Sequence, residues 1–379
     1  MDNIPEHLIW SECEKDHNQE ELMNIVQTYH TIKERIQKTV GKERITRIRT
    51  MAWMQSGILH SRSVHLTRIA SKIPGSAKKL SVADRFRSFL NNAHVHVRKW
   101  YRPIAQALIQ EASKAGKPLR FFIDGSKIGN NHQLLMVSLG YRRRALPIAW
   151  TWVRAKRGHS SGRLQCALLT YVHQLVLPGV QVVVCGDSEF TPLQALLESW
   201  HWFYALRQKG SHLLRKEEAD AWQRCDSLVT KPGQRCWLSD IQLTKAYQYP
   251  CNFLALWQCG EKEPWLLATN LSDARTIRLH YSRRMWTEEM FGDFKRHGFD
   301  LESSRLQHFL RLSRLTLAVS MLYVTVVAFG SQTIKNGRRH LVDRPDRRDL
   351  SIFRIGFDML DRCFANGHSV SIRLIPYFL

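Results

Sequence analysis

Four residues in the C-terminal third of the chain have types and spacings that suit phosphate chemistry. The segment 281–295, YSRRMWTEEMFGDFK, contains Tyr281, Arg284, Glu288 and Lys295, with two, three and six residues between them. At about 3.6 residues per turn, one helix would place all four within an arc of about 60°. Charged residues rarely face a core unpaired. The pattern therefore indicates either a solvated face of salt-bridged residues or an acid held among groups that bind phosphate.

Two aspartates upstream each follow a predicted strand. LRFFID (119–124) ends in Asp124, and VQVVVCGD (180–187), a valine-rich run typical of a strand buried on both faces, ends in Asp187. Reactive groups in open sheets gather beyond the carboxyl ends of strands, so both aspartates lie where a site is expected. Either aspartate taken alone also fits a residue that caps a turn.

Asp124, Asp187 and Glu288 together indicate a metal-dependent site. Three carboxylates that converge repel one another unless hard cations such as Mg²⁺ lie between them. Two such ions, about 3.5 to 4 Å apart, can activate a water or a 3′ hydroxyl and stabilise the leaving oxygen in an in-line displacement at phosphorus. The arginine, lysine and phenol of the first motif would then bind phosphates of the strand being cut.

The composition favours a nucleic-acid partner. The 379 residues include 56 Lys and Arg against 33 Asp and Glu, which gives a net charge of +23. Such an excess favours a polyanion. With 44% hydrophobic residues the chain can bury a large core in two or three domains. Membrane binding is less favoured, because the first 21 residues hold seven acids and one lysine and resemble neither a basic anchor nor a signal peptide.

The cysteines and the longest apolar run argue against two further classes of protein. The eight cysteines include no Cys-x-x-Cys pair, so we expect reduced, mostly buried thiols instead of a zinc site or a disulfide framework. The run LTLAVSMLYVTVVAFG (315–330) spans 16 residues, fewer than the roughly 20 that a bilayer needs. We therefore expect a buried helix there.

Basic helices are predicted in the N-terminal part of the chain. Residues 22–118 contain 19 Lys or Arg and four acids. Residues 31–53 predict a basic helix or a helix pair, and residues 63–92 predict a helix, a Pro-Gly turn and a second helix that begins at Ser81. Such a helix-turn-helix would place one helix in a major groove. An ordinary helical bundle with a basic surface fits these residues equally well.

Short apolar runs after residue 117 predict an α/β fold. We expect two strands within 133–153, helices within 161–177 and 191–202, and another strand within 203–210. With the strands before the two aspartates, the order strand, strand, strand, helix, strand, helix, strand is that of the ribonuclease H fold. Several β-like runs between residues 211 and 276 predict a β-rich insertion.

The predicted fold class is α/β: a ribonuclease H-like catalytic core with a β-rich insertion, preceded by an all-helical DNA-binding region. The predicted parts are, in chain order, a helical DNA-binding region (1–115), the first part of the core (116–210), the β-rich insertion (211–276), the last part of the core with the Glu288 helix (277–335), and a C-terminal tail that is a candidate for dimerisation (336–379).

The order Asp124, Asp187, Glu288 with a Tyr-x2-Arg-x3-Glu-x6-Lys signature resembles the DDE transposases of bacterial insertion sequences, specifically insertion-sequence family four. IDGSKIG around Asp124 and VVVCGDSEF around Asp187 add to the resemblance, which spans about residues 80–325. Four defined residue types at three fixed gaps make the signature specific. The interval of 63 residues between the two aspartates is short for the family.

The resemblance implies a core that depends on Mg²⁺ or Mn²⁺ and moves an insertion sequence by cut and paste. The implied partners are double-stranded DNA, both the terminal inverted repeats of the element and the target DNA, and a second copy of the chain in a homodimeric synaptic complex. We expect a cytoplasmic, nucleoid-associated bacterial protein without membrane contact.

Three further DNA-binding residues follow from the resemblance. Relatives excise through a DNA hairpin, with a flipped base stacked on a tryptophan of the insertion, and that tryptophan corresponds to Trp265. A core role is the alternative for Trp265. Arg207 and Lys209, in YALRQKG, match basic positions that contact DNA in relatives, and a surface ion pair is the alternative there.

Two other functions stay open. One is a non-catalytic descendant that binds element ends as a repressor, which the intact Asp124, Asp187 and Glu288 argue against. The other is a ribonuclease H-like nuclease without strand transfer, which the β-rich insertion and the Tyr-Arg-Glu-Lys signature argue against.

Overall fold

The computed structural model describes residues 6–129, 132–154, 160–368 and 370–378. Their contacts divide the chain into two compact units. The sheet unit is Ile109–Met290, and the helical unit is Met1–Leu108 together with Phe291–Leu379. The division falls inside two helices, α5 (Val97–Ser113) and α9 (Met285–Phe294). The five-part division expected from the sequence stays a prediction.

One continuous sheet runs through the sheet unit. Its strands are β1 (Leu119–Ile128), β2 (His132–Tyr141), β3 (Arg144–Arg154), β4 (Val182–Gly186), β5 (Phe203–Arg207), β6 (Leu213–Arg215), β7 (Gln223–Arg224), β8 (Arg235–Leu243), β9 (Tyr249–Leu256) and β10 (Trp265–Thr269). They lie in the order β3-β2-β1-β4-β5-β10-β9-β8-β6-β7. The strands β1, β2 and β3 pair antiparallel, whereas β1, β4 and β5 pair parallel. The expected mixture of helices and a large sheet is confirmed.

Strands β2, β3 and β4 form where their sequences predict. The β2–β3 hairpin turns at Arg142 and Arg143, whose φ angles of 39° and 63° are those of a two-residue turn that matches the twist of its strands. All five residues of β4 are buried, as expected for a valine-rich strand covered on both faces. The apolar core of this unit therefore reaches the residue that directly precedes Asp187.

The helices of the sheet unit follow its strands at the expected places. Helix α6 (Gly162–His173) lies between β3 and β4 in the chain, and the 3₁₀ helix η1 (Ser188–Leu193) and α7 (Gln194–Ser199) lie between β4 and β5. Helix α8 (Ala274–Ser282) follows the last strand. The Ser161 side chain caps α6 by accepting a hydrogen bond from the Leu164 N–H at 3.4 Å. The Asp273 side chain caps α8 in the same way, from the Thr276 N–H at 2.8 Å.

The residues of the expected insertion extend the central sheet. Strand β10 pairs antiparallel with β5, and β9, β8, β6 and β7 follow outward from it. Strand β8 (Arg235–Leu243) is the longest of these strands. The β-rich character predicted for this part of the chain is confirmed, and its strands join the same sheet as the two aspartates.

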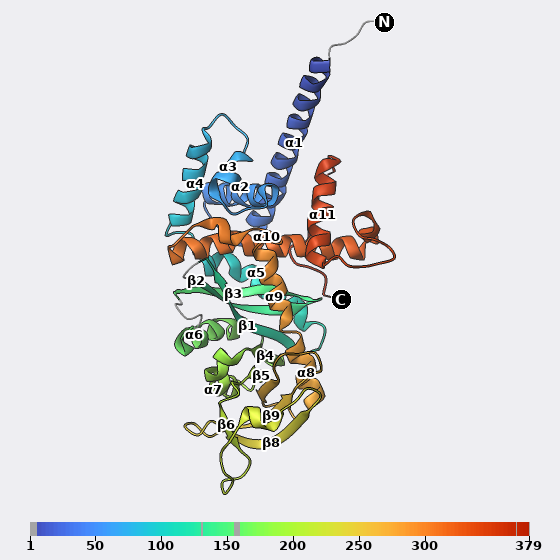
Figure 1. The fold of residues 1–379 in the computed structure, drawn as a ribbon. Helices are drawn as coiled ribbons and strands as arrows, with labels where there is room; N and C mark the ends of the chain where they lie inside the picture. Colours follow the sequence, from blue (N-terminus) through green and yellow to red (C-terminus); the bar gives the residue numbers. More distant parts are fainter. Residues whose placement is uncertain (1–5, 130–131, 155–159, 369, 379) are drawn as a thin grey trace. The chain divides into compact units, whose positions relative to one another are not determined.

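The helical unit is built around one apolar helix. Its helices include α1 (Glu6–Val40), α2 (Ile45–Ser61), α3 (Leu66–Ser71), α4 (Lys79–Asn91), α10 (Phe309–Lys335) and α11 (Ile352–Ala365). Figure 1 shows α10, in orange, running past α2 and α4, which it contacts. Helix α10 is long and apolar enough to cross a membrane, but 94% of its most apolar window is buried in the protein. The buried helix expected over residues 315–330 is confirmed.

Two glycines let α10 and α11 cross closely. A Cβ atom on Gly330 would lie 2.0 Å from the Ile352 carbonyl oxygen, and one on Gly356 would lie 2.0 Å from the Val326 carbonyl oxygen. No side chain larger than hydrogen fits at either position without moving a helix.

The basic N-terminal segments form the expected helices. Residues 31–53 belong to the helix pair α1 and α2, and residues 63–92 form α3, a turn and α4. Helix α4 begins at Lys79, two residues before the predicted start.

Candidate active site

Asp124 and Asp187 are neighbours because of the register of the parallel strands. The pairing of β1 with β4 ends at Ile123 opposite Gly186, so the two aspartates are the next residue on each side. The prediction that the first strand ends at Asp124 is wrong. Strand β1 continues to Ile128, because residues beyond Asp124 still pair with β2.

The signature residues do not lie on one helix, so the prediction of a single helix over residues 281–295 is wrong. Helix α8 ends at Ser282 and α9 begins at Met285. At the break the Arg284 N–H bonds to the Tyr281 carbonyl, three residues back, as in a turn. Each helix aligns with its own strands: α8 contacts β4 and β5, while Thr287 of α9 lies 3.3 Å from Ser138 of β2.

One face of β1 holds this broken segment in place. Alternate residues of a strand point to the same face, and three alternate residues of β1 each contact a residue of this segment. Arg120 Nε donates to His280 Nδ1 at 2.8 Å, the Phe122 ring meets the Trp286 ring edge-on at 6.4 Å, and Asp124 accepts from Arg284. These side-chain contacts of β1 hold Arg284 in its position.

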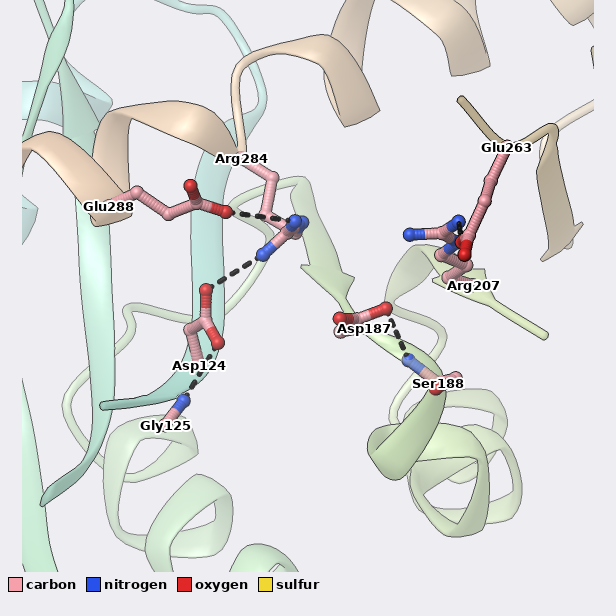
Figure 2. A network of polar contacts seen from close by, with 8 residues as sticks. All are labelled: Asp124, Gly125, Asp187, Ser188, Arg207, Glu263, Arg284 and Glu288. Carbon is pink, nitrogen blue, oxygen red and sulfur yellow. Dashed lines mark hydrogen bonds and ion pairs between the residues drawn. The ribbon is translucent and has the colours of Figure 1, made fainter. Parts of the chain in front are cut away.

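The guanidinium of Arg284 lies between the acids (Figure 2). Its Nη1 donates to Asp124 Oδ2 at 2.8 Å, and its Nη2 donates to Glu288 Oε1 at 3.2 Å. The side chains of Arg284 and Asp124 are 11% and 14% exposed, whereas that of Glu288 is 49% exposed. A buried arginine therefore joins a strand residue and a helix residue that are 164 positions apart in the chain.

Burial and neighbouring charges perturb Asp124. Burial raises the pKa of its carboxyl group from 3.8 to about 6, against the opposing effects of the Arg284 guanidinium and the Gly125 N–H. The carboxylates of Asp187 and Glu288 make smaller contributions to the same increase in pKa. Asp187 and Glu288 therefore each lie close enough to Asp124 to act on it electrostatically.

Asp187 is held at the end of β4 by the backbone that follows it. Its Oδ1 accepts a hydrogen bond from the Ser188 N–H at 2.8 Å, which caps η1 (Figure 2). Burial alone would lower the pKa of the Arg284 guanidinium, but Tyr281 and the three acids hold that pKa above its ordinary value. The arginine is thus the positive centre of the cluster.

Tyr281 and Trp265 lie beside this cluster. The Tyr281 ring lies 5.7 Å from the Arg284 guanidinium, and burial raises the pKa of its phenol to about 12. Trp265, the first residue of β10, is half-buried and meets the Tyr281 ring at 5.1 Å with an interplanar angle of 70°. The structure brings the expected base-stacking tryptophan next to the expected phosphate-binding tyrosine.

The other predicted DNA-binding residues have separate surroundings. Arg207 Nη2 donates to Glu263 at 2.9 Å, the surface ion pair that we regarded as the alternative for this residue (Figure 2). Lys209 is exposed. Lys295 belongs to the helical unit, directly after α9, and its Nζ lies 3.7 Å from Glu302.

Four residues that position the site were not predicted from the sequence. Arg120 and Phe122 precede Asp124 at alternate positions, and His280 and Trp286 flank the signature. The period of two before Asp124 was a usable signal for a shared face. Nothing in the sequence indicated that His280 and Trp286 are the partners of Arg120 and Phe122.

The oxygen donors of the site suit a hard cation. One oxygen each of Asp187 and Glu288 has no protein partner among the described residues. In the arrangement observed, however, no group of three or more His, Cys, Asp or Glu among the described residues is close enough to hold a metal. The guanidinium of Arg284 bonds to both Asp124 and Glu288, two of the acids that were expected to hold the cation.

Comparisons with known proteins assign the chain to no family. No protein-family model matches it, and no curated protein matches it. Among solved structures, the chain is similar to the cryo-EM structure of a piggyBac transposase synaptic complex with hairpin DNA, with a TM-score of 0.43 and 11% identity. The match covers 92% of this chain and 81% of that chain. A likeness this distant has no bearing on function, for which the site itself is the basis.

Proposed function

We propose that the chain is a DDE transposase that cuts the ends of a mobile DNA element and joins them to a target. The observation that carries the proposal is the gathering of Asp124, Asp187 and Glu288 around Arg284 from three separate elements of the sheet unit. A buried carboxyl group with a strongly perturbed pKa and specific charged partners, as Asp124 has, is a common feature of functional sites. Three carboxylates, an arginine and a phenol match the needs of phosphoryl transfer in charge and in donor type.

The strand arrangement supports a ribonuclease H-like core in the sheet unit. Three antiparallel strands followed by two parallel ones, in the order β3-β2-β1-β4-β5, agree with the succession of elements expected from the sequence. In this arrangement the first two acids lie beyond the parallel pairing of β1 and β4, where loops and helices are free to hold substrate.

Asp124, Asp187 and Glu288 are the residues that would hold Mg²⁺ or Mn²⁺. Their carboxylate oxygens are the ligands that such cations prefer. A bound pair of these ions would activate a water or a 3′ hydroxyl and stabilise the leaving oxygen at phosphorus. Arg284 must leave Asp124 to make room, and its guanidinium is then available to bind a phosphate of the DNA in a bidentate manner.

The remaining residues of the proposal serve DNA binding. Tyr281, Arg207 and Lys209 would contact phosphates around the cut, and Lys295 would do the same from the end of α9. Trp265 would stack on a flipped base while the element end forms a hairpin, since an indole face offsets part of the cost of unstacking.

The helical unit supplies a basic surface for the element ends. Around the α3–α4 turn, Lys78, Lys79, Arg85 and Arg87 are exposed, although Arg87 also pairs with Asp84. Such a surface would neutralise phosphates of the terminal inverted repeats. A homodimer that pairs two ends, and a cytoplasmic location at the nucleoid, belong to the same proposal.

A non-catalytic DNA-binding repressor is the second candidate. The observation that favours it is the pair of Arg284 bonds, which satisfy Asp124 and Glu288 without any cation. In a repressor these ion pairs would be permanent structural contacts. In a transposase they would be exchanged for metal ions and phosphates.

A transposition assay separates the candidates. Inverted repeats are first identified in the DNA that flanks the gene, and a plasmid carrying two such ends is then incubated with the full chain, a target plasmid and Mg²⁺. We expect excised element, hairpin ends and joining to the target, all abolished by Asp187→Asn while end binding is retained. Cleavage without joining would indicate a nuclease, and binding without cleavage would indicate a repressor. Absence of both binding and cleavage would overturn the proposal.

A further inference from the structure

The sheet unit contains a cavity of about 630 Å³ whose lining includes the residue after Asp187. Its wall includes Ser188 and Glu189, the two residues that follow Asp187, and Lys209, which lies two residues beyond β5. Tyr247 lines it from the turn between β8 and β9. The volume lies within the range of about 300 to 1,000 Å³ that small-ligand sites have.

The charges of the lining disfavour a bare polyanion as the ligand. Among the described residues that line the cavity, Glu189 and Lys209 carry the only opposite formal charges, so the two cancel. Burial, together with the charge of Lys209, lowers the pKa of His212, which keeps its imidazole neutral at pH 7. Hydroxyl groups such as those of Thr191 and Thr244 complete a lining that fits a neutral ligand with a polar edge.

The imidazole of His212, which lines the cavity, is held by the buried side chain of Gln208. The Nε2 of Gln208, a residue that is 2% exposed, donates to the Leu206 carbonyl at 3.2 Å, so its Oε1 is the acceptor. That Oε1 lies 3.0 Å from His212 Nδ1 and accepts from Thr191 at 3.3 Å. His212 must therefore donate from Nδ1, which leaves Nε2 unprotonated as a hydrogen-bond acceptor.

Tyr247 offers an aromatic face that the core does not use. The residue is 79% exposed, while the neighbouring lining residue Tyr249 is half-buried. Every nucleobase has a π face that can stack on such a ring, whatever its sequence. The cavity thus combines an aromatic platform, a neutral polar lining and one lysine.

We propose that this cavity holds an unpaired base of the DNA strand that passes Asp187, stacked on Tyr247, with Lys209 at the adjoining phosphate. The inference rests on the proposed function, because a DNA substrate is what brings a base to this position. The site is distinct from Trp265, which does not line the cavity and contacts Tyr281 instead.

The test compares the affinity of the full chain for a blunt duplex and for the same duplex with a single-stranded 3′ overhang of thymidines. We expect the overhang to bind roughly tenfold more tightly. Tyr247→Ala should abolish that preference and leave blunt-duplex binding within about twofold, whereas Tyr247→Phe should retain it, because stacking needs only the ring. Lys209→Ala should weaken the overhang preference more than Lys245→Ala, which removes an exposed lysine of the Tyr247 turn that does not line the cavity.

A crosslinking measurement locates the base independently. An overhang that carries 5-iodo-2′-deoxyuridine should crosslink to a peptide that contains Tyr247. Crosslinking to Trp265 alone, or an overhang preference that survives Tyr247→Ala, would overturn this inference and leave the proposed function intact. Absence of binding to any DNA would overturn both.

Discussion

Asp124→Asn should stabilise the metal-free protein at neutral pH, even though it removes a charge that Arg284 binds. The pKa of Asp124 is about 6 in the fold against 3.8 for the unfolded reference, mainly because the carboxyl group is buried. At about 1.36 kcal/mol for each pH unit, this difference means that ionised Asp124 costs the fold about 3 kcal/mol once the pH is above both values. Asparagine has nearly the same shape and no charge to desolvate.

The sign of the pH dependence follows from proton binding. Between pH 3.8 and about 6 the folded protein holds the Asp124 proton more tightly than the unfolded chain does. Stability from this group is therefore present at low pH and is lost as the pH rises through about 6. The advantage of Asp124→Asn should grow from about 1 kcal/mol at pH 4.5 to about 3 kcal/mol at pH 7.5.

Urea unfolding in the presence of a chelator, followed by tryptophan fluorescence at several pH values, measures this difference. Glu289→Gln is the matched control, since Glu289 is 56% exposed and pairs with Arg144 at 3.2 Å, and we expect it to change stability by less than about 0.5 kcal/mol. If Asp124→Asn were less stable than the parent protein at pH 7.5, the ion pair with Arg284 would outweigh the burial of Asp124, and the reasoning would be refuted.

Three further predictions concern other parts of the molecule. Arg284→Gln should lower the free energy of unfolding by about 3 kcal/mol at pH 7.5, because it leaves Asp124 buried without its partner, and adding Asp124→Asn should restore most of the loss; equal effects in both backgrounds would contradict the coupling. Trp265→Ala should spare the first nick but impair hairpin formation, seen as accumulated nicked DNA on a denaturing gel; an unchanged product pattern would exclude the stacking role. Gly356→Ala should destabilise the helical unit by about 1 to 3 kcal/mol in thermal unfolding, because its Cβ would collide with the Val326 carbonyl; an unchanged melting temperature would show that α10 and α11 can separate freely.

Local patterns were sufficient to predict the strands that carry the two aspartates. The valine run before Asp187 and the apolar stretches flanking Arg142 and Arg143 have lengths and residue types that few structures other than strands accommodate. The apolar run of α10 predicted a helix, but the helix is longer than the run and long enough for a bilayer, so it is its burial in the protein that identifies it as a core helix. These elements are specified mainly by their own residues.

The details of the site depend on contacts between distant residues, which no local pattern contains. The periodicity of 281–295 fits one helix, but bonds of Arg284 to Asp124 and of Thr287 to Ser138 accompany a break into two. Strand β1 likewise continues beyond Asp124, because its residues there still pair with β2. The residue types of the signature were readable, whereas the pairing of Arg284 with two acids required the fold.

Binding of Mn²⁺ to the full chain, followed by electron paramagnetic resonance, tests most directly whether the three acids share metal ions. The parent protein should bind Mn²⁺, and Glu288→Gln should weaken that binding by about tenfold or more, because a charged ligand is lost. The adjacent change Glu289→Gln should leave binding unaltered, since that side chain pairs with Arg144. Equal Mn²⁺ binding by all three proteins, or no binding by the parent protein, would contradict the metal site on which the proposed reaction depends.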